Sequence, residues 1–212
     1  MPIIASNTGS TSHEPIASGS YAARCYSMIH LGTIEETILG TTKKLNKVRI
    51  TWEMPTEMKV FKEENGEQPQ VISKEFTLSL HEKATLRNFL KNWRGKDFTE
   101  EEAKAFDIEK LVGAPCMINI THKQSKDGTK TYAEIGSISP MPKGLVCPDQ
   151  INKSFIFTYD DFDLQKFNTL PDYIKNKMIN SDEFKLAVTN GQEHESHEAK
   201  IDSIDESMDL PF

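Results

Sequence analysis

Residues 45–54 of this chain, LNKVRITWEM, alternate between apolar and polar side chains along their length. One side of an extended chain would carry Val48, Ile50, Trp52 and Met54, and the other would carry Lys47, Arg49, Thr51 and Glu53. A period of two is typical of a strand that is buried on one face and solvated on the other. We therefore predict a fold built around a β-sheet with one apolar face.

Four other stretches also have β-type patterns. They are residues 21–31, 71–80, 116–123 and 130–141. Asn65-Gly66 lies between the second and third predicted strands, and Asp127-Gly128 lies between the fourth and fifth. Asn-Gly favours a hairpin turn in which both central residues have positive φ. We therefore expect strands two and three to form a long antiparallel hairpin whose tip extends beyond the domain.

Residues 82–95 predict a helix between the third and fourth strands. Its apolar stripe consists of Leu86, Phe89, Leu90 and Trp93. This spacing is that of one helix face, and Gly95 is placed to end the helix. Thr99 and Glu102 form a capping-box pattern that indicates a second, short helix. The order β-β-β-α-β-β predicts a mainly β protein, a five-stranded OB-fold-like Greek-key barrel with a helix between strands 3 and 4.

The chain beyond the barrel predicts an aromatic, strand-like segment at 155–167 and a helix at 170–187. We expect both to pack on the barrel, and the alternative is a separate helical appendage. The predicted organisation is a disordered lead (1–19), an OB-fold domain with a C-terminal helical extension (20–188) and an acidic disordered tail (189–212).

Several protein classes are disfavoured by composition. The first twenty residues contain no Lys or Arg and no continuous apolar core, so a signal peptide is not expected. No stretch approaches the roughly 20 apolar residues of a membrane-spanning helix. Cys25, Cys116 and Cys147 are too few and too widely spaced for a disulfide framework. The sequence therefore predicts a cytoplasmic protein with reduced thiols.

The acidity of the chain is concentrated at its end. The chain has 25 basic and 32 acidic side chains, and its net charge is −7. Residues 193–212 contain seven of the acids and one of the bases, a net charge of −6. Residues 1–192 retain 24 bases against 25 acids, so the body is nearly neutral. The low pI therefore describes the tail and does not exclude a nucleic-acid-binding body.

No catalytic motif stands out. The chain has no phosphate-binding Gly-rich loop, nucleophile elbow or His-Glu metal signature. His194 and His197 lie together in the polar tail without further ligands at metal spacing, so we interpret them as solvated. We predict a protein that is not an enzyme and needs no cofactor or metal.

Basic and aromatic residues coincide at several places on the predicted barrel. Single-strand binding needs cations for phosphates and flat rings on which bases stack. The candidate DNA-binding residues are Arg24, Tyr26, Lys47, Arg49, Lys59, Phe61, Lys130 and Tyr132. Trp52 and Phe76 share the parity of the apolar faces, so we assign them to the core. The helical stripe of Lys and Arg between residues 83 and 94 is interpreted as a solvated face.

The parts together resemble a known family. The stretches GSYAARCYSMIHLGT, KVRITWEMPTE and EIGSISPMPKG are similar to phage-encoded single-stranded DNA-binding proteins, over about residues 19–165. The terminal DESMDLPF resembles the end of bacterial single-stranded DNA-binding proteins, although Ser207 and Met208 interrupt its acids.

This resemblance implies a protein that coats single-stranded DNA without sequence preference during phage replication, recombination and repair, in the cytoplasm of the bacterial host. It also implies that Asp209, Leu210, Pro211 and Phe212 bind replication or repair proteins, such as a polymerase, helicase or primase. Two alternatives remain: an OB-fold adaptor that binds protein, and a strand-annealing recombination mediator. The sequence leaves the oligomeric state open.

Overall fold

A six-stranded sheet forms the centre of the computed structural model, which describes residues 14–189. The strands are β1 (Gly19–Ile38), β2 (Thr41–Val60), β3 (Glu67–Thr77), β4 (Pro115–Gln124), β5 (Thr131–Ser139) and β6 (Phe155–Phe157). The order is β3-β2-β1-β4-β5, these neighbours pair antiparallel, and β6 pairs parallel with β1. The prediction of a mainly β fold is confirmed.

The sheet does not form the closed five-stranded barrel that the sequence predicted. Within residues 14–189, no hydrogen-bonded ladder joins the outer strands β3 and β5. One side chain crosses between them, because Lys74 Nζ donates to the Ile135 carbonyl over 3.2 Å. Helix α1 (Thr85–Arg94) contacts both β3 and β5, and its apolar stripe is buried in the core. The helix therefore fills the space that strand pairing would otherwise close.

The first two strands are longer than predicted. The pairing of β1 with β2 continues to Ile38 and Thr41, through a turn in which Leu39 and Gly40 have φ angles of 52° and 79°. Near this end Glu35 pairs with Lys44 and Glu36 with Lys43. Oppositely charged residues thus lie in register here, and they replace the apolar alternation because this part of the hairpin is largely exposed.

The β2–β3 hairpin is confirmed, but the predicted turn type was wrong. A 3₁₀ turn (Glu63–Asn65) forms the tip, and only Gly66, at 65°, has a positive φ there. The 3₁₀ turn makes this loop longer than a two-residue hairpin turn. Asn65 therefore does not need a positive φ.

The two helices predicted between the third and fourth strands are present, whereas the helix predicted at 170–187 is broken at 179–181, and only residues 155–157 of the strand-like segment at 155–167 form a strand. Gly95 ends α1 with a φ of 70°, and the capping box at Thr99 begins α2 (Glu100–Lys104). A 3₁₀ turn (Ile108–Leu111) then leads into β4. The C-terminal part contains α3 (Leu164–Asn168), α4 (Asp172–Met178) and a helical segment at 182–189.

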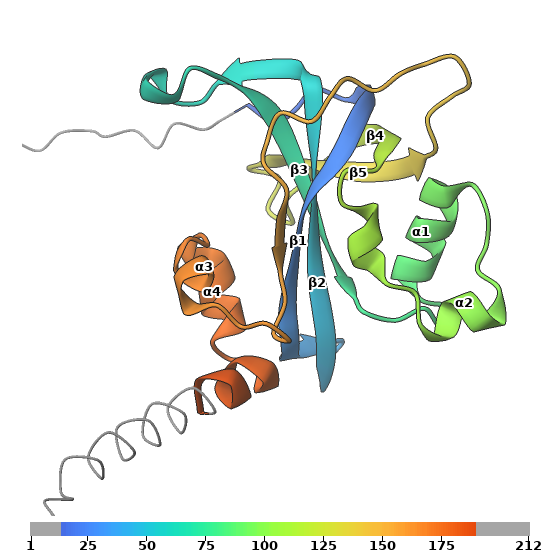
Figure 1. The fold of residues 1–212 in the computed structure, drawn as a ribbon. Helices are drawn as coiled ribbons and strands as arrows, with labels where there is room; N and C mark the ends of the chain where they lie inside the picture. The colour runs from blue at the N-terminus through green and yellow to red at the C-terminus, as the bar shows by residue number, and fades with distance from the viewer. Residues whose placement is uncertain (1–13, 190–212) are drawn as a thin grey trace, which may run out of the picture.

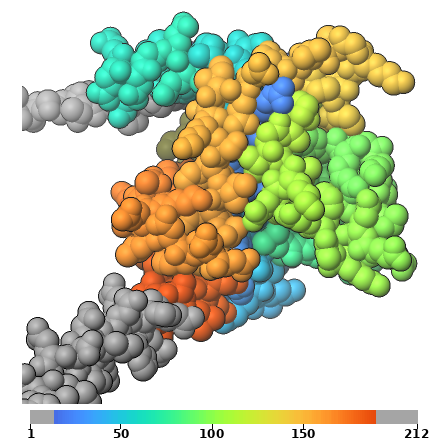
Figure 2. All heavy atoms as spheres, viewed as in Figure 1, coloured from blue at the N-terminus to red at the C-terminus, as the bar shows by residue number. Residues whose placement is uncertain are grey.

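Hydrophobic cores lie on both faces of the long β1–β2 hairpin. Trp52 and Phe76 are buried against α1 in the first core, as predicted. In the second core, Ile29 and Leu31 of β1 pack with residues of β6, α3 and α4, including Phe157 and Phe167. Figure 1 shows α1 and α2 on one side of this hairpin and α3 and α4 on the other. In Figure 2 the segment from about residue 150 onward covers much of β1 on the visible face.

Gly32 marks the closest approach of the C-terminal segment to β1. Its φ is +84°, and an added Cβ would lie 2.6 Å from the Cβ and Oγ of Ser181. We expect Gly32→Ala to lower the free energy of unfolding by about 2–4 kcal/mol, because it adds a clash to left-handed strain. Urea denaturation measures this loss.

Gly40 provides the matched control for Gly32. Its φ is +79°, but nothing lies within 4 Å of an added Cβ. Gly40→Ala should therefore cost only about 1 kcal/mol, the conformational term alone. Equal losses for the two variants would contradict the close packing at Gly32.

Candidate nucleic-acid interface

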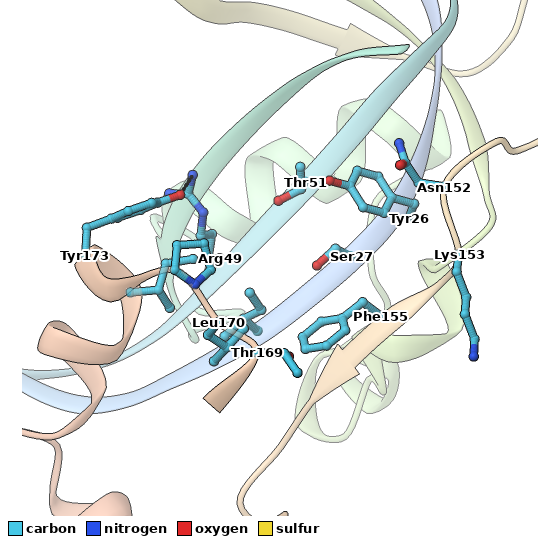
Figure 3. Close-up of a pocket in the computed structure, with 13 residues that line it drawn as sticks. Tyr26, Ser27, Arg49, Thr51, Asn152, Lys153, Phe155, Thr169, Leu170 and Tyr173 are labelled. Atoms are coloured by element: carbon cyan, nitrogen blue, oxygen red, sulfur yellow. Dashed lines mark hydrogen bonds between the residues drawn. The ribbon is translucent and has the colours of Figure 1, made fainter. Parts of the chain in front are cut away.

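A pocket of about 360 Å³ opens between the β1–β2 surface and the segment that follows β5. The lining residues that matter for its chemistry are Tyr26, Arg49, Thr51, Lys153, Phe155 and Tyr173. We call this site the Tyr26 pocket. Figure 3 shows Tyr26 and Phe155 on one side of it and Arg49 beside Tyr173 on the other. Three aromatic rings and the guanidinium of Arg49, from four separate elements, therefore meet at one place, and the Lys153 side chain extends away from them (Figure 3).

A β-bulge in β1 positions Tyr26. Cys25 pairs with Trp52, and Ser27 pairs with Thr51, so Tyr26 is the extra residue between two registered pairs. The bulge reverses the alternation, because Cys25 and Met28 both face the first core. A bulge of this kind re-aims one side chain, and here it leaves Tyr26 in the pocket wall.

Burial makes Tyr26 a persistent hydrogen-bond donor. Desolvation, and secondly the nearby charge of Glu53, raise the pKa of its phenol above the ordinary value. The hydroxyl therefore stays protonated at neutral pH, and its ring remains half-buried beside the cavity.

Arg49 belongs to a small charged network at the side of the pocket. Its Nη1 lies 3.2 Å from Glu75 Oε1, and its Nη2 donates to the Tyr173 hydroxyl over 3.2 Å. Its Cζ also lies 5.4 Å from the centroid of the Tyr173 ring. Lys177, one helical turn after Tyr173, reaches the same Glu75 carboxylate at 2.7 and 2.8 Å. This network joins α4 to β2 and β3.

A buried carboxylate fixes the opposite wall. Glu53 is fully buried, and it accepts hydrogen bonds from the backbone N–H groups of Ile151 and Asn152 at 2.6 and 2.8 Å. The Asn152 amide also donates to it over 2.6 Å. This anchor holds the chain immediately before Lys153, and β6 then pairs Phe155 with Ser27. Glu53 therefore positions the pocket residues Lys153 and Phe155.

Only two of the eight predicted DNA-binding residues line the Tyr26 pocket, namely Tyr26 and Arg49. Lys47 lies on the same strand as Arg49 and pairs with Glu36 at 2.6 Å. The guanidinium of Arg24 donates to the carbonyls of Pro148, Gly113 and Cys147, so it holds a loop in place. We therefore leave Arg24 out of the interface.

The other four predicted residues lie on two hairpins. Lys59 is near the end of β2 and Phe61 directly follows this strand, near the tip of the β2–β3 hairpin. Lys130 and Tyr132 are at the start of the β4–β5 hairpin's second strand, where Tyr132 is 53% exposed. The structure therefore does not bring the predicted residues into one site. The predicted partner-binding residues Asp209, Leu210, Pro211 and Phe212 lie outside the described residues.

Sequence reasoning missed Lys153, Phe155, Tyr173 and Lys177. Tyr173 and Lys177 are four residues apart on α4, a spacing that places them on one helix face. The spacing could have indicated that Tyr173 and Lys177 act together. No pattern in the sequence indicated which strand the face would meet.

The helical Lys and Arg stripe has a structural explanation. Arg87 and Lys91 both pair with Asp97, and Arg94 pairs with Glu102. These contacts fasten α1 to the segment that follows it. The stripe is thus engaged within the protein rather than simply solvated.

No protein-family model, curated protein or solved structure matches this chain. Within residues 14–189, no three His, Cys, Asp or Glu side chains are grouped so that they could hold a metal ion. None of the helices in that range has the length and apolar character needed to span a membrane.

Proposed function

We propose that this protein is a phage single-stranded DNA-binding protein with an OB-fold, and that it is not an enzyme. The observation that carries the proposal is the Tyr26 pocket, where aromatic rings and the guanidinium of Arg49 converge from distant segments. The strand order, with α1 between β3 and β4, supports an OB-fold in which the β3–β5 edges remain unpaired.

The chemistry of the pocket suits a single strand of any sequence. Bases stack on the rings of Tyr26 and Phe155, and phosphates meet the cations of Arg49 and Lys153. Lys153 is among the residues that line the pocket, so its charge lies near a strand bound there. Stacking tolerates every base because each has a π-face, which fits a protein that coats DNA during replication and recombination.

The tail completes the proposal on sequence grounds. Leu210 and Phe212 would enter an apolar pocket of a replication or repair protein, while Asp209 would meet a basic neighbour. The body would bind DNA, and the tail would recruit enzymes to it.

One observation favours the alternative of an OB-fold protein adaptor. Several cations near the pocket are already paired with acids, as in Lys47–Glu36 and Lys44–Asp182. The body therefore lacks the strong positive field that draws DNA to many proteins. An annealing mediator would share the DNA surface and differ by pairing complementary strands.

Binding of a labelled dT oligonucleotide tests the proposal. We expect tighter binding to dT than to a duplex of equal length, with a log–log salt slope of about −0.7 per phosphate neutralised. A chain ending at Gln192 should bind at least as tightly, because the acidic tail competes with DNA for the cations. Salt-insensitive binding, or no preference over duplex, would rule out this function. Accelerated pairing of complementary oligonucleotides would identify the annealing mediator.

A further inference from the structure

Glu75 lies between two cations beside the Tyr26 pocket. Lys177 Nζ lies 2.7 and 2.8 Å from its two carboxylate oxygens, and Arg49 Nη1 lies 3.2 Å from the first of them. Two cations therefore share one carboxylate, and this group of three side chains retains a net charge of +1. Arg49 also borders the pocket itself.

A phosphate can occupy the position that the Glu75 carboxylate takes between the two cations. A carboxylate and a phosphate are both multidentate oxygen acceptors, and Arg and Lys bind either of them through charge-assisted hydrogen bonds. The Tyr173 hydroxyl accepts from Arg49 and helps to hold the guanidinium in place. The two cations are therefore already arranged to bind an oxyanion.

Solvent reaches the network from the α4 side. The side chain of Lys177 is 43% exposed, whereas those of Glu75 and Arg49 are only about a fifth exposed. An incoming anion can therefore approach Lys177 first. Burial acts to raise the pKa of Glu75, but the hydrogen bond and charge of Lys177, together with Arg49, lower it overall. The carboxylate accordingly stays charged at neutral pH and retains its hold on both cations.

We propose that Arg49 and Lys177 form a phosphate subsite in which Glu75 is a built-in competitor. A backbone phosphate of the bound strand takes the place of the Glu75 carboxylate between the two cations. This inference rests on the proposed function and identifies one phosphate contact of that surface. It also explains how a nearly neutral body can offer cations to a polyanion, because Glu75 partly neutralises Arg49 and Lys177 in the free protein and gives them up to the phosphate.

Glu75→Gln tests the competitor directly, because it removes the charge and keeps the side-chain shape. We expect the Kd for a dT oligonucleotide to fall about fivefold, the scale of one partly exposed ion pair. The salt slope should steepen by up to about 0.7, because the phosphate then neutralises a positive charge that Glu75 neutralises in the unaltered chain. Glu67→Gln is the matched control, since it removes one charge from an exposed position of the same strand. An affinity for Glu75→Gln equal to or weaker than that of Glu67→Gln would overturn the inference.

Binding of inorganic tripolyphosphate tests the subsite independently of DNA binding. Calorimetry measures the affinity of the protein for tripolyphosphate. Glu75→Gln should bind tripolyphosphate more tightly than the unaltered chain does, and adding Lys177→Met should abolish the gain. If this gain appears while the unaltered chain fails to bind dT, the subsite stands and the proposed function falls. If dT binds but neither probe distinguishes Glu75→Gln from Glu67→Gln, the function stands and the competitor is refuted.

Lys177→Met alone provides a second test that does not depend on the folding of the Glu75 variant. It leaves Glu75 opposite Arg49 and removes one of the two cations. We expect weaker dT binding and a shallower salt slope. An unchanged dT affinity would show that Lys177 contributes no phosphate contact and would overturn the subsite.

Discussion

Replacing Glu53 with glutamine is expected to lower the free energy of unfolding by about 2–3 kcal/mol. Three donors converge on the buried Glu53 carboxylate, and two of them are the backbone N–H groups of Ile151 and Asn152. A glutamine keeps only one acceptor oxygen and turns an NH₂ group toward these donors. At least one buried donor therefore loses its acceptor, and urea denaturation measures the loss.

The same change should also weaken DNA binding, because Glu53 holds the chain that leads to Lys153 and Phe155. Glu67→Gln is again the control, and it should leave stability within about 0.5 kcal/mol of the unaltered chain. Full stability in Glu53→Gln would mean that the anchor does not position the pocket wall. Lower stability with unchanged dT affinity would place the DNA outside the Tyr26 pocket.

The second large effect is expected at Tyr26. We expect Tyr26→Ala to raise the Kd for a dT oligonucleotide about tenfold, because a stacked base contributes about 1–3 kcal/mol. Tyr26→Phe keeps the ring and should retain most of the affinity. Fluorescence anisotropy with labelled dT measures both variants.

Tyr132→Ala discriminates between two surfaces. Tyr132 is exposed on the β4–β5 hairpin and is not part of the pocket. We expect little change in dT affinity for this variant. A larger loss at Tyr132 than at Tyr26 would move the DNA-binding surface to β5.

Local pattern predicted much of the sheet and little of the pocket. The alternation around Trp52 correctly placed the apolar residues of β2 in one core, but the predicted solvated side was wrong, because Thr51 and Glu53 are buried as well. The helix stop at Gly95 and the capping box at Thr99 were also predictable, because each depends on residues that are close in sequence. Long-range contacts are different: the three carbonyls bound by Arg24 belong to loops that only the fold brings together.

The pocket itself could not be predicted for a physical reason. β6 is only three residues long, so it has no measurable periodicity, and Phe155 is one of several aromatic residues in the segment 155–167 with no pattern that marks it as a pocket residue. The bulge at Tyr26 inserts one residue into a regular register, and a single sequence contains no signal that locates it. Tyr26 was therefore selected for its chemistry, without the geometry that places it.

The edge of β1 is divided between two partners. Its first residues, from Gly19 to Arg24, pair with β4, and Ser27 to Ile29 then pair with β6. β6 follows all the other strands in the chain. The part of the edge from Ser27 to Ile29 therefore stays open during synthesis until residues 155–157 have left the ribosome. An open strand edge can pair wrongly with other chains, and contacts between distant residues form slowly. Once it has been made, β6 therefore protects the edge of β1 from such pairing. A protein shortened before β6 would leave the edge at Ser27 to Ile29 exposed.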